Sequence, residues 1–258
     1  MFYVMIITSI LTLLIDKKDS DISVSNNRLL VLFLITGIVA TFFDFLTTEI
    51  LTIFVPLLFL IIIRKKENRL ESFKNTLIFI LKACILWFLG YGLMWLTKWV
   101  LSSLILNINA FDYVKRNFTL RFNGLQGLES KEVLYRNVIP RNIFCMPFMY
   151  YIRENFDKLI VRYFVFLFVG LILVFLDWKN MKNKKYYIFL LIISLMPYAR
   201  YLILANHSYR HLMFTFRDQI LTLIVLMYII VDSFNYKLFS KKIDINIPIR
   251  KKEVKIKK

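Results

Sequence analysis

The residues best suited to chemistry lie in one short stretch, NHSYRHLMFTFR, which separates two strongly apolar runs. His207 and His211 are the only histidines of the 258-residue chain, and they are four positions apart. On a helix both rings would therefore project from the same face. Arg210 and Arg217 are seven positions apart and would share the adjacent face. The stretch thus combines two titratable rings with two permanent positive charges.

Three chemistries are open to this stretch. Two imidazoles one helical turn apart can chelate zinc, but the sequence offers no clear third ligand and no HExxH motif, so we predict no metal site. A His/Arg turn at a membrane surface can bind ordinary lipid headgroups. It can also form a dedicated anion site, because arginine donates paired hydrogen bonds to phosphate and histidine adds a donor or a proton.

Four further charged residues adjoin or interrupt apolar runs. Asp44 and Glu49 lie in FFDFLTTEI, where a charge is costly and often functional, although both carboxylates are equally consistent with the wet tip of a helical hairpin. Lys98, in WFLGYGLMWLTKW, is either an interfacial lysine reaching headgroups or a cation at the mouth of a helix bundle. Arg200 follows Pro197 near the end of an apolar run and requires a partner or a water-filled cavity.

These residues need a membrane fold to position them. The chain is 59% hydrophobic with a mean hydropathy of +0.61, well above a soluble domain. We predict an all-α, polytopic integral membrane protein with about seven transmembrane helices. The predicted runs are 1–15, 29–45, 46–63, 76–98, 159–177, 186–204 and 218–235. The net charge of +18 lies mostly in short connections between these runs, so we expect no nucleic-acid partner.

Lysine and arginine counts predict the orientation. The connections 16–28, 64–75 and 178–185 and the tail from 236 hold 21 of the 35 basic residues, whereas the opposite connections hold 9. The positive-inside rule then places the C-terminus in the cytoplasm and the N-terminus outside. It also places FFDFLTTEI, the loop 107–157 and NHSYRH together on the outer face.

We divide the chain into four regions. They are 1–106, the N-terminal helices with a tight 29–63 hairpin; 107–158, an external amphipathic segment; 159–235, the last three helices; and 236–258, a basic cytoplasmic tail. The amphipathic segment mixes aromatic and basic residues, which suits helices lying in the membrane interface, although a small soluble cap is the alternative.

Three stretches together resemble a known class of enzyme. FFDFLTTEILTIFVPLLF, WFLGYGLMWLTKW and RYLILANHSYRHLMFTFR are similar to the later part of bacterial GT-C type glycosyltransferases, over about residues 28–235. The resemblance implies transfer of a sugar from a polyprenyl-phosphate donor to a glycan or lipid acceptor of the cell envelope, on the outer face and without a further cofactor. Lys98, Glu49 and the five His and Arg residues from 200 to 217 would then bind substrate.

The resemblance is incomplete at the N-terminus. GT-C enzymes carry a catalytic acid in a large external loop after their first helix, and here the first helix leads inward. Because Met1 opens directly into an apolar run, we expect the chain to be the C-terminal part of a longer protein. Alternatively, Asp44 takes the role of the missing acidic residue, as the catalytic carboxylate that deprotonates the acceptor hydroxyl. The alternatives are a transporter or flippase of a lipid-linked intermediate and a non-catalytic membrane subunit.

Overall fold

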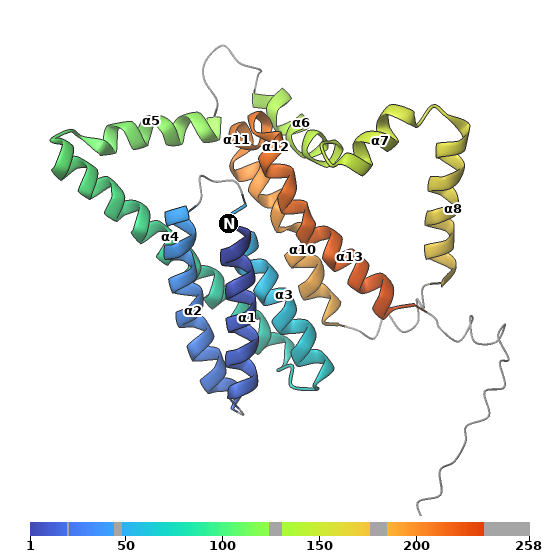
Figure 1. The fold of residues 1–258 in the computed structure, drawn as a ribbon, viewed down its shortest axis with the longest axis horizontal. Helices are drawn as coiled ribbons and strands as arrows, with labels where there is room; N and C mark the ends of the chain where they lie inside the picture. Colours follow the sequence, from blue (N-terminus) through green and yellow to red (C-terminus); the bar gives the residue numbers. More distant parts are fainter. Residues whose placement is uncertain (20, 44–47, 124–130, 176–184, 235–258) are drawn as a thin grey trace, which may run out of the picture.

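The structure is a computed structural model that describes residues 1–19, 21–43, 48–123, 131–175 and 185–234 (Figure 1). Every regular element in these ranges is a helix, so the all-α prediction is confirmed for them. The helices are α1 (Phe2–Lys18), α2 (Ile22–Phe43), α3 (Leu51–Lys66), α4 (Phe73–Leu106), α5 (Ala110–Asn123), α6 (Lys131–Phe144), α7 (Pro147–Asn155), α8 (Leu159–Phe175), α10 (Tyr187–Ile203), α11 (Ala205–Arg210), α12 (Leu212–Thr215), the 3₁₀ helix η1 (Phe216–Gln219) and α13 (Ile220–Asp232).

Among the described residues, three segments are long and apolar enough to cross a membrane. They are α2, α4 and the run Leu212–Asp232, which joins α12, η1 and α13. Each of the other predicted runs also falls on a helix, but α1, α8 and α10 have 17 residues and α3 has 16. At 1.5 Å per residue, 17 residues cover about 25 Å of a hydrocarbon core that is about 30 Å thick. The structure therefore supports a membrane protein, and the count of seven spans stays a prediction.

Close backbone contact joins α2 to α4. Gly37 and Gly90 face each other's helix, and a Cβ atom at either position would collide with a main-chain carbonyl oxygen, of Trp87 or of Leu34 respectively. Thr41 adds a hydrogen bond from its hydroxyl to the carbonyl oxygen of Tyr91, at 3.0 Å. Small residues that let two helices approach are typical of membrane helix pairs.

The predicted 29–63 hairpin has arms that pack mainly on other helices. Figure 1 shows α1 between α2 and α3; α3 packs chiefly on α1, whereas α2 packs chiefly on α4. The core is formed by apolar side chains of α2, α3 and α4 together with one face of α10 and α13. Glu49, which directly precedes this buried α3, is therefore carried into the interior.

An ionic network fixes the end of the bundle where α1 and α2 meet. The Arg64 guanidinium of α3 donates from Nε and one Nη to Asp16 Oδ1 of α1, at 2.8 and 2.7 Å. Arg69 donates to the other oxygen of this carboxylate, Oδ2, at 2.8 Å. The Ser25 hydroxyl of α2 donates to Oδ1. Asp16 and Arg64 are buried, so this network ties three helices together.

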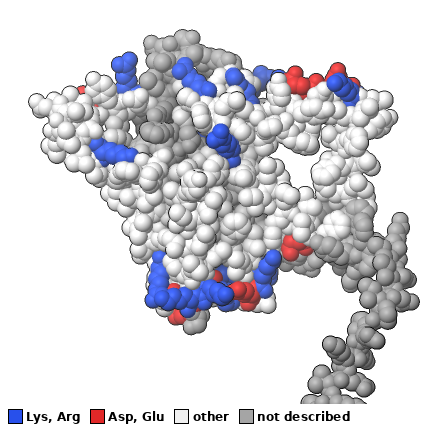
Figure 2. Space-filling view, in the orientation of Figure 1, with Lys and Arg blue, Asp and Glu red and all other residues white. Residues whose placement is uncertain are grey.

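The predicted amphipathic segment forms three helices at the opposite end. In Figure 1, α5, α6 and α7 run across this end at a large angle to α1, α2 and α3, and α8 stands apart at the far side. Both α5 and α6 pack against α11. Figure 2 shows lysine and arginine gathered near the two ends of the molecule, with a belt between them that is nearly free of charge. Such a belt has the character of a hydrocarbon-facing surface.

Candidate functional site

The candidate site is built on the connection between α10 and α13. The chain leaves α10 at Ile203, forms the six-residue α11, breaks at His211 and re-enters helix through α12 and η1. Non-helical dihedral angles at Leu204 and His211 turn the chain on either side of α11. These breaks place His207 and Arg210 on α11, His211 at the break itself and Arg217 on η1, rather than all of them on one continuous helix.

The two histidines lie together, as their spacing predicts. Their ring centroids are 4.7 Å apart. His207 is buried, whereas His211 and the neighbouring Arg210 are exposed. Within the described part of the chain no group of three His, Cys, Asp or Glu side chains is arranged to hold a metal ion. His211 and Arg210 are therefore both accessible to a ligand, and the His211 ring packs beside the buried ring of His207.

Arg200 is enclosed in a buried ionic cluster. Its Nε and one Nη atom donate to the two carboxylate oxygens of Glu49, at 2.7 and 3.1 Å, and Nε lies 3.3 Å from an oxygen of Asp218. The three side chains are 4%, 6% and 0% exposed. Two-point contact between arginine and a carboxylate is the strong form of this interaction. The cluster links the turn before α3 to α10 and η1. Within it, Arg200 and Glu49 bind each other.

Arg200 and Glu49 therefore have a structural role in this cluster. The substrate-binding role predicted for them from the sequence remains a prediction. Sequence reasoning identified both residues but not their pairing, because 151 positions separate them. Asp218 directly follows NHSYRHLMFTFR in the sequence and was assigned no partner. A signal was available, since two ionisable residues near the ends of apolar segments each require a partner of opposite charge.

A second buried network was not predicted at all. Asn142 of α6 is fully buried; its side-chain amide donates to the carbonyl oxygen of Ser208 at 3.1 Å and accepts from the Thr215 hydroxyl at 2.7 Å. Gln219 donates to the main-chain carbonyl oxygen of Asn142 at 2.8 Å, and Tyr201 donates to that of Thr215 at 2.7 Å. Besides a local bond to the carbonyl oxygen of Val138, the partners of Asn142 lie 66 to 77 positions away, so no local pattern marked its role in this network. The network ties Ser208, Thr215 and Gln219 of this connection to α6.

Lys98 belongs to α4, and its side chain reaches the end of α2. Its Nζ donates to the carbonyl oxygen of Thr41 at 2.8 Å and lies 5.4 Å from the centroid of the Phe42 ring. A cation that satisfies a carbonyl of the last helical turn also interacts favourably with the helix dipole. Lys98 is thus held at Thr41 and Phe42, whereas Asp44 lies outside the described residues. Its role in substrate binding remains a prediction.

Arg217 has a different environment from Arg210. It is exposed, lies 5.7 Å from the Phe214 ring centroid and lines an apolar groove beside α7. The predicted arginines therefore lie in three environments. Arg200 is buried, Arg210 is exposed next to His211, and Arg217 lines a groove. They do not form a single cluster.

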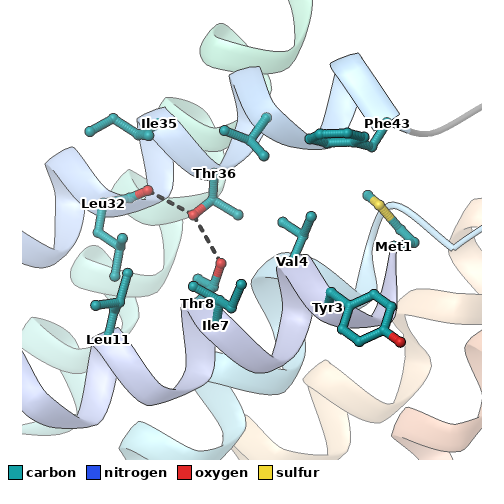
Figure 3. A pocket seen from close by; sticks show the side chains of 11 residues that line it. Met1, Tyr3, Val4, Ile7, Thr8, Leu11, Leu32, Ile35, Thr36 and Phe43 are labelled. Carbon is teal, nitrogen blue, oxygen red and sulfur yellow. Dashed lines mark hydrogen bonds between the residues drawn. The ribbon is translucent and has the colours of Figure 1, made fainter.

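A further hollow between α1 and α2 lacks the chemistry of a site. Figure 3 shows it, with a volume of about 440 Å³, extending from Met1 to Phe43. No side chain that lines it is charged, and its polar groups are mainly Thr8 and Thr36, whose hydroxyls lie 3.3 Å apart. Since these hydroxyls contact each other or the main chain, this hollow offers a ligand little beyond hydrocarbon contacts.

Comparison of the chain with protein-family models, with curated proteins and with solved structures finds no match. The assignment of function rests on the site. Its chemistry is that of a cationic, hydrogen-bonding surface supported by buried ionic and amide networks.

Proposed function

We propose that this protein is a membrane glycosyltransferase-like protein that transfers a sugar from a polyprenyl-phosphate donor to a cell-envelope acceptor on the outer face. One observation carries the proposal: Arg210 and His211 are exposed on a connection that buried hydrogen bonds anchor at Ser208 and Thr215. A pair of donors on an anchored connection suits a phosphate whose charge grows as it leaves the sugar. The GT-C resemblance of the sequence supplies the reaction class.

The proposed topology has seven spans, with the N-terminus outside and the C-terminus in the cytoplasm. The Lys and Arg count of the connections supports it, as does the nearly uncharged belt in Figure 2. The shorter helices α1, α3, α8 and α10 would complete the count beside the three longer segments. In this orientation α5, α6, α7 and α11 lie at the outer interface.

The proposed mechanism is a displacement at the anomeric carbon. The acceptor hydroxyl oxygen bonds to this carbon as the bond from the carbon to the donor phosphate oxygen breaks, and a carboxylate takes the hydroxyl proton. Glu49 and Asp218 are close to Arg200 in the interior, and we propose Asp44, the acidic residue that the sequence singles out, as the base. Arg210 and His211 then stabilise the lipid phosphate as its negative charge increases.

The test is sugar transfer in liposomes by the purified, reconstituted chain, with radiolabelled polyprenyl-phosphate sugars and extracted envelope glycan as acceptor. Arg210→Gln should lower kcat/KM about a hundredfold, because it removes a charged donor to the leaving phosphate. Arg116→Gln, which removes an exposed positive charge from α5, is the matched control and should transfer at the wild-type rate.

Three outcomes contradict the proposal. They are no transfer by the wild-type chain from any donor, equal transfer by Arg210→Gln and the wild type, and transbilayer movement of the donor without transfer. The last result assigns the protein to the flippase class instead.

A further inference from the structure

An apolar groove opens on the side of the molecule where α7 crosses the start of α13. It has a volume of about 570 Å³, and its walls come from α1, α7, η1 and α13. Its main apolar lining residues are Phe2, Met146, Phe148, Phe216, Ile220 and Leu223. Phe148, Ile220 and Leu223 are 71%, 40% and 45% exposed, so the groove faces outward from the bundle rather than into it.

One lining residue, Arg217, carries a charge. It lies in the sixth position of Leu212–Asp232, a segment apolar and long enough to span a membrane. Its guanidinium contacts the Phe214 ring, and no carboxylate among the described residues forms a salt bridge with it. An arginine on the surface of a spanning segment is costly unless it meets an anion or reaches the interface. The ligand that best suits Arg217 is therefore an anionic group that lies beside hydrocarbon.

Neighbouring residues in η1 face the other way. Asp218 and Gln219 are buried against Arg200 and Asn142, whereas Phe216 and Arg217 line the groove. The groove is thus separated by packed side chains from the buried networks that support the histidine pair. Any lipid of the surrounding leaflet has lateral access to it, and bulk phospholipid is the most abundant anionic lipid there, so mass action favours it.

We propose that this groove binds an anionic phospholipid of the outer leaflet, with one acyl chain against α7 and α13 and the phosphate on Arg217. This site goes beyond the proposed sugar transfer and does not depend on it.

The experiment measures lipid retention by the full chain. The purified protein is equilibrated with phosphatidylglycerol, phosphatidylcholine or polyprenyl phosphate, and bound lipid is counted by native mass spectrometry. Wild type should retain phosphatidylglycerol, and Arg217→Gln should bind it at least about tenfold more weakly, because a charge-assisted hydrogen bond to the phosphate is lost. Arg153→Gln, an exposed arginine of α7 that lies outside the groove lining, is the matched control and should retain the lipid as wild type does.

A second variant keeps the test valid if Arg217→Gln folds poorly. Leu223→Trp fills the groove without changing charge, whereas Leu226→Trp places the same ring on the exposed surface of α13 outside the groove lining. Only Leu223→Trp should lose the lipid. Equal retention of phosphatidylcholine and phosphatidylglycerol, unchanged retention by both groove variants, or displacement of phosphatidylglycerol by equimolar polyprenyl phosphate each overturns the proposal.

Discussion

Removing the charge of Arg200 should be among the most damaging single changes in this protein. In Arg200→Met the buried carboxylates of Glu49 and Asp218 keep their charges but lose the guanidinium that lies 2.7 and 3.3 Å from them. Taking one partner from a buried ionic cluster costs about 3–5 kcal/mol of folding free energy. For a chain of this size, about 2–4 °C per kcal/mol gives a fall in Tm of about 6–20 °C.

The assay is thermal unfolding of the purified protein in detergent, followed by intrinsic fluorescence. Arg210→Met is the control, because it removes the same group from an exposed position of the same region and should change the free energy of unfolding by less than about 0.5 kcal/mol. The triple variant Glu49→Gln, Arg200→Met, Asp218→Asn should recover most of the lost stability, since no unpaired charge remains buried. Equal Tm values for Arg200→Met and Arg210→Met would refute the reasoning, as would a triple variant no more stable than Arg200→Met.

Two further predictions test the packing and the topology. Gly90→Ala places a methyl group against the carbonyl oxygen of Leu34 and should cost at least about 1–3 kcal/mol in the same unfolding assay, whereas Gly92→Ala, with open space around it, should be neutral. A membrane-impermeant maleimide added to intact cells should label Cys145 but not Cys84, which lies within α4. Partial burial raises the pKa of the Cys145 thiol, so its labelling should be slower than that of free cysteine near neutral pH and should accelerate as pH rises; labelling of Cys145 only after permeabilisation would contradict the proposed orientation.

The positions of the helices followed from local signals, but several boundaries did not, most of all the end of α4. The run predicted as 76–98 is part of α4, which continues to Leu106. Lys98 and Trp99 indicated a membrane interface, and the predicted span was ended there. A helix ends where the backbone is interrupted, however, and this first happens at Asn107, a left-handed residue with φ of 49°. Lys98 instead turns back to the end of α2.

The candidate site was only partly predictable, because its residues were visible and their partners were not. Spacing brought His207 and His211 together, since residues four positions apart are neighbours on a helix. The pairing of Arg200 with Glu49 depends on how α3 and α10 pack, which is information that neither segment contains. Asn142 was missed for the same reason: a lone asparagine in a loop-like stretch gains its meaning only when α6 packs on α11.

The separation of the arginines into three environments decides how loss of function should be interpreted. Arg200 is buried in a cluster, Arg210 is exposed beside His211, and Arg217 lines a lateral groove. A change at Arg200 should therefore lower sugar transfer together with Tm, because the frame itself is weakened. A change at Arg210 should lower transfer at constant Tm, and a change at Arg217 should first lower lipid retention. A variant that combined these signatures differently would show that the three environments are coupled, and only then would a single continuous anion site be the better description.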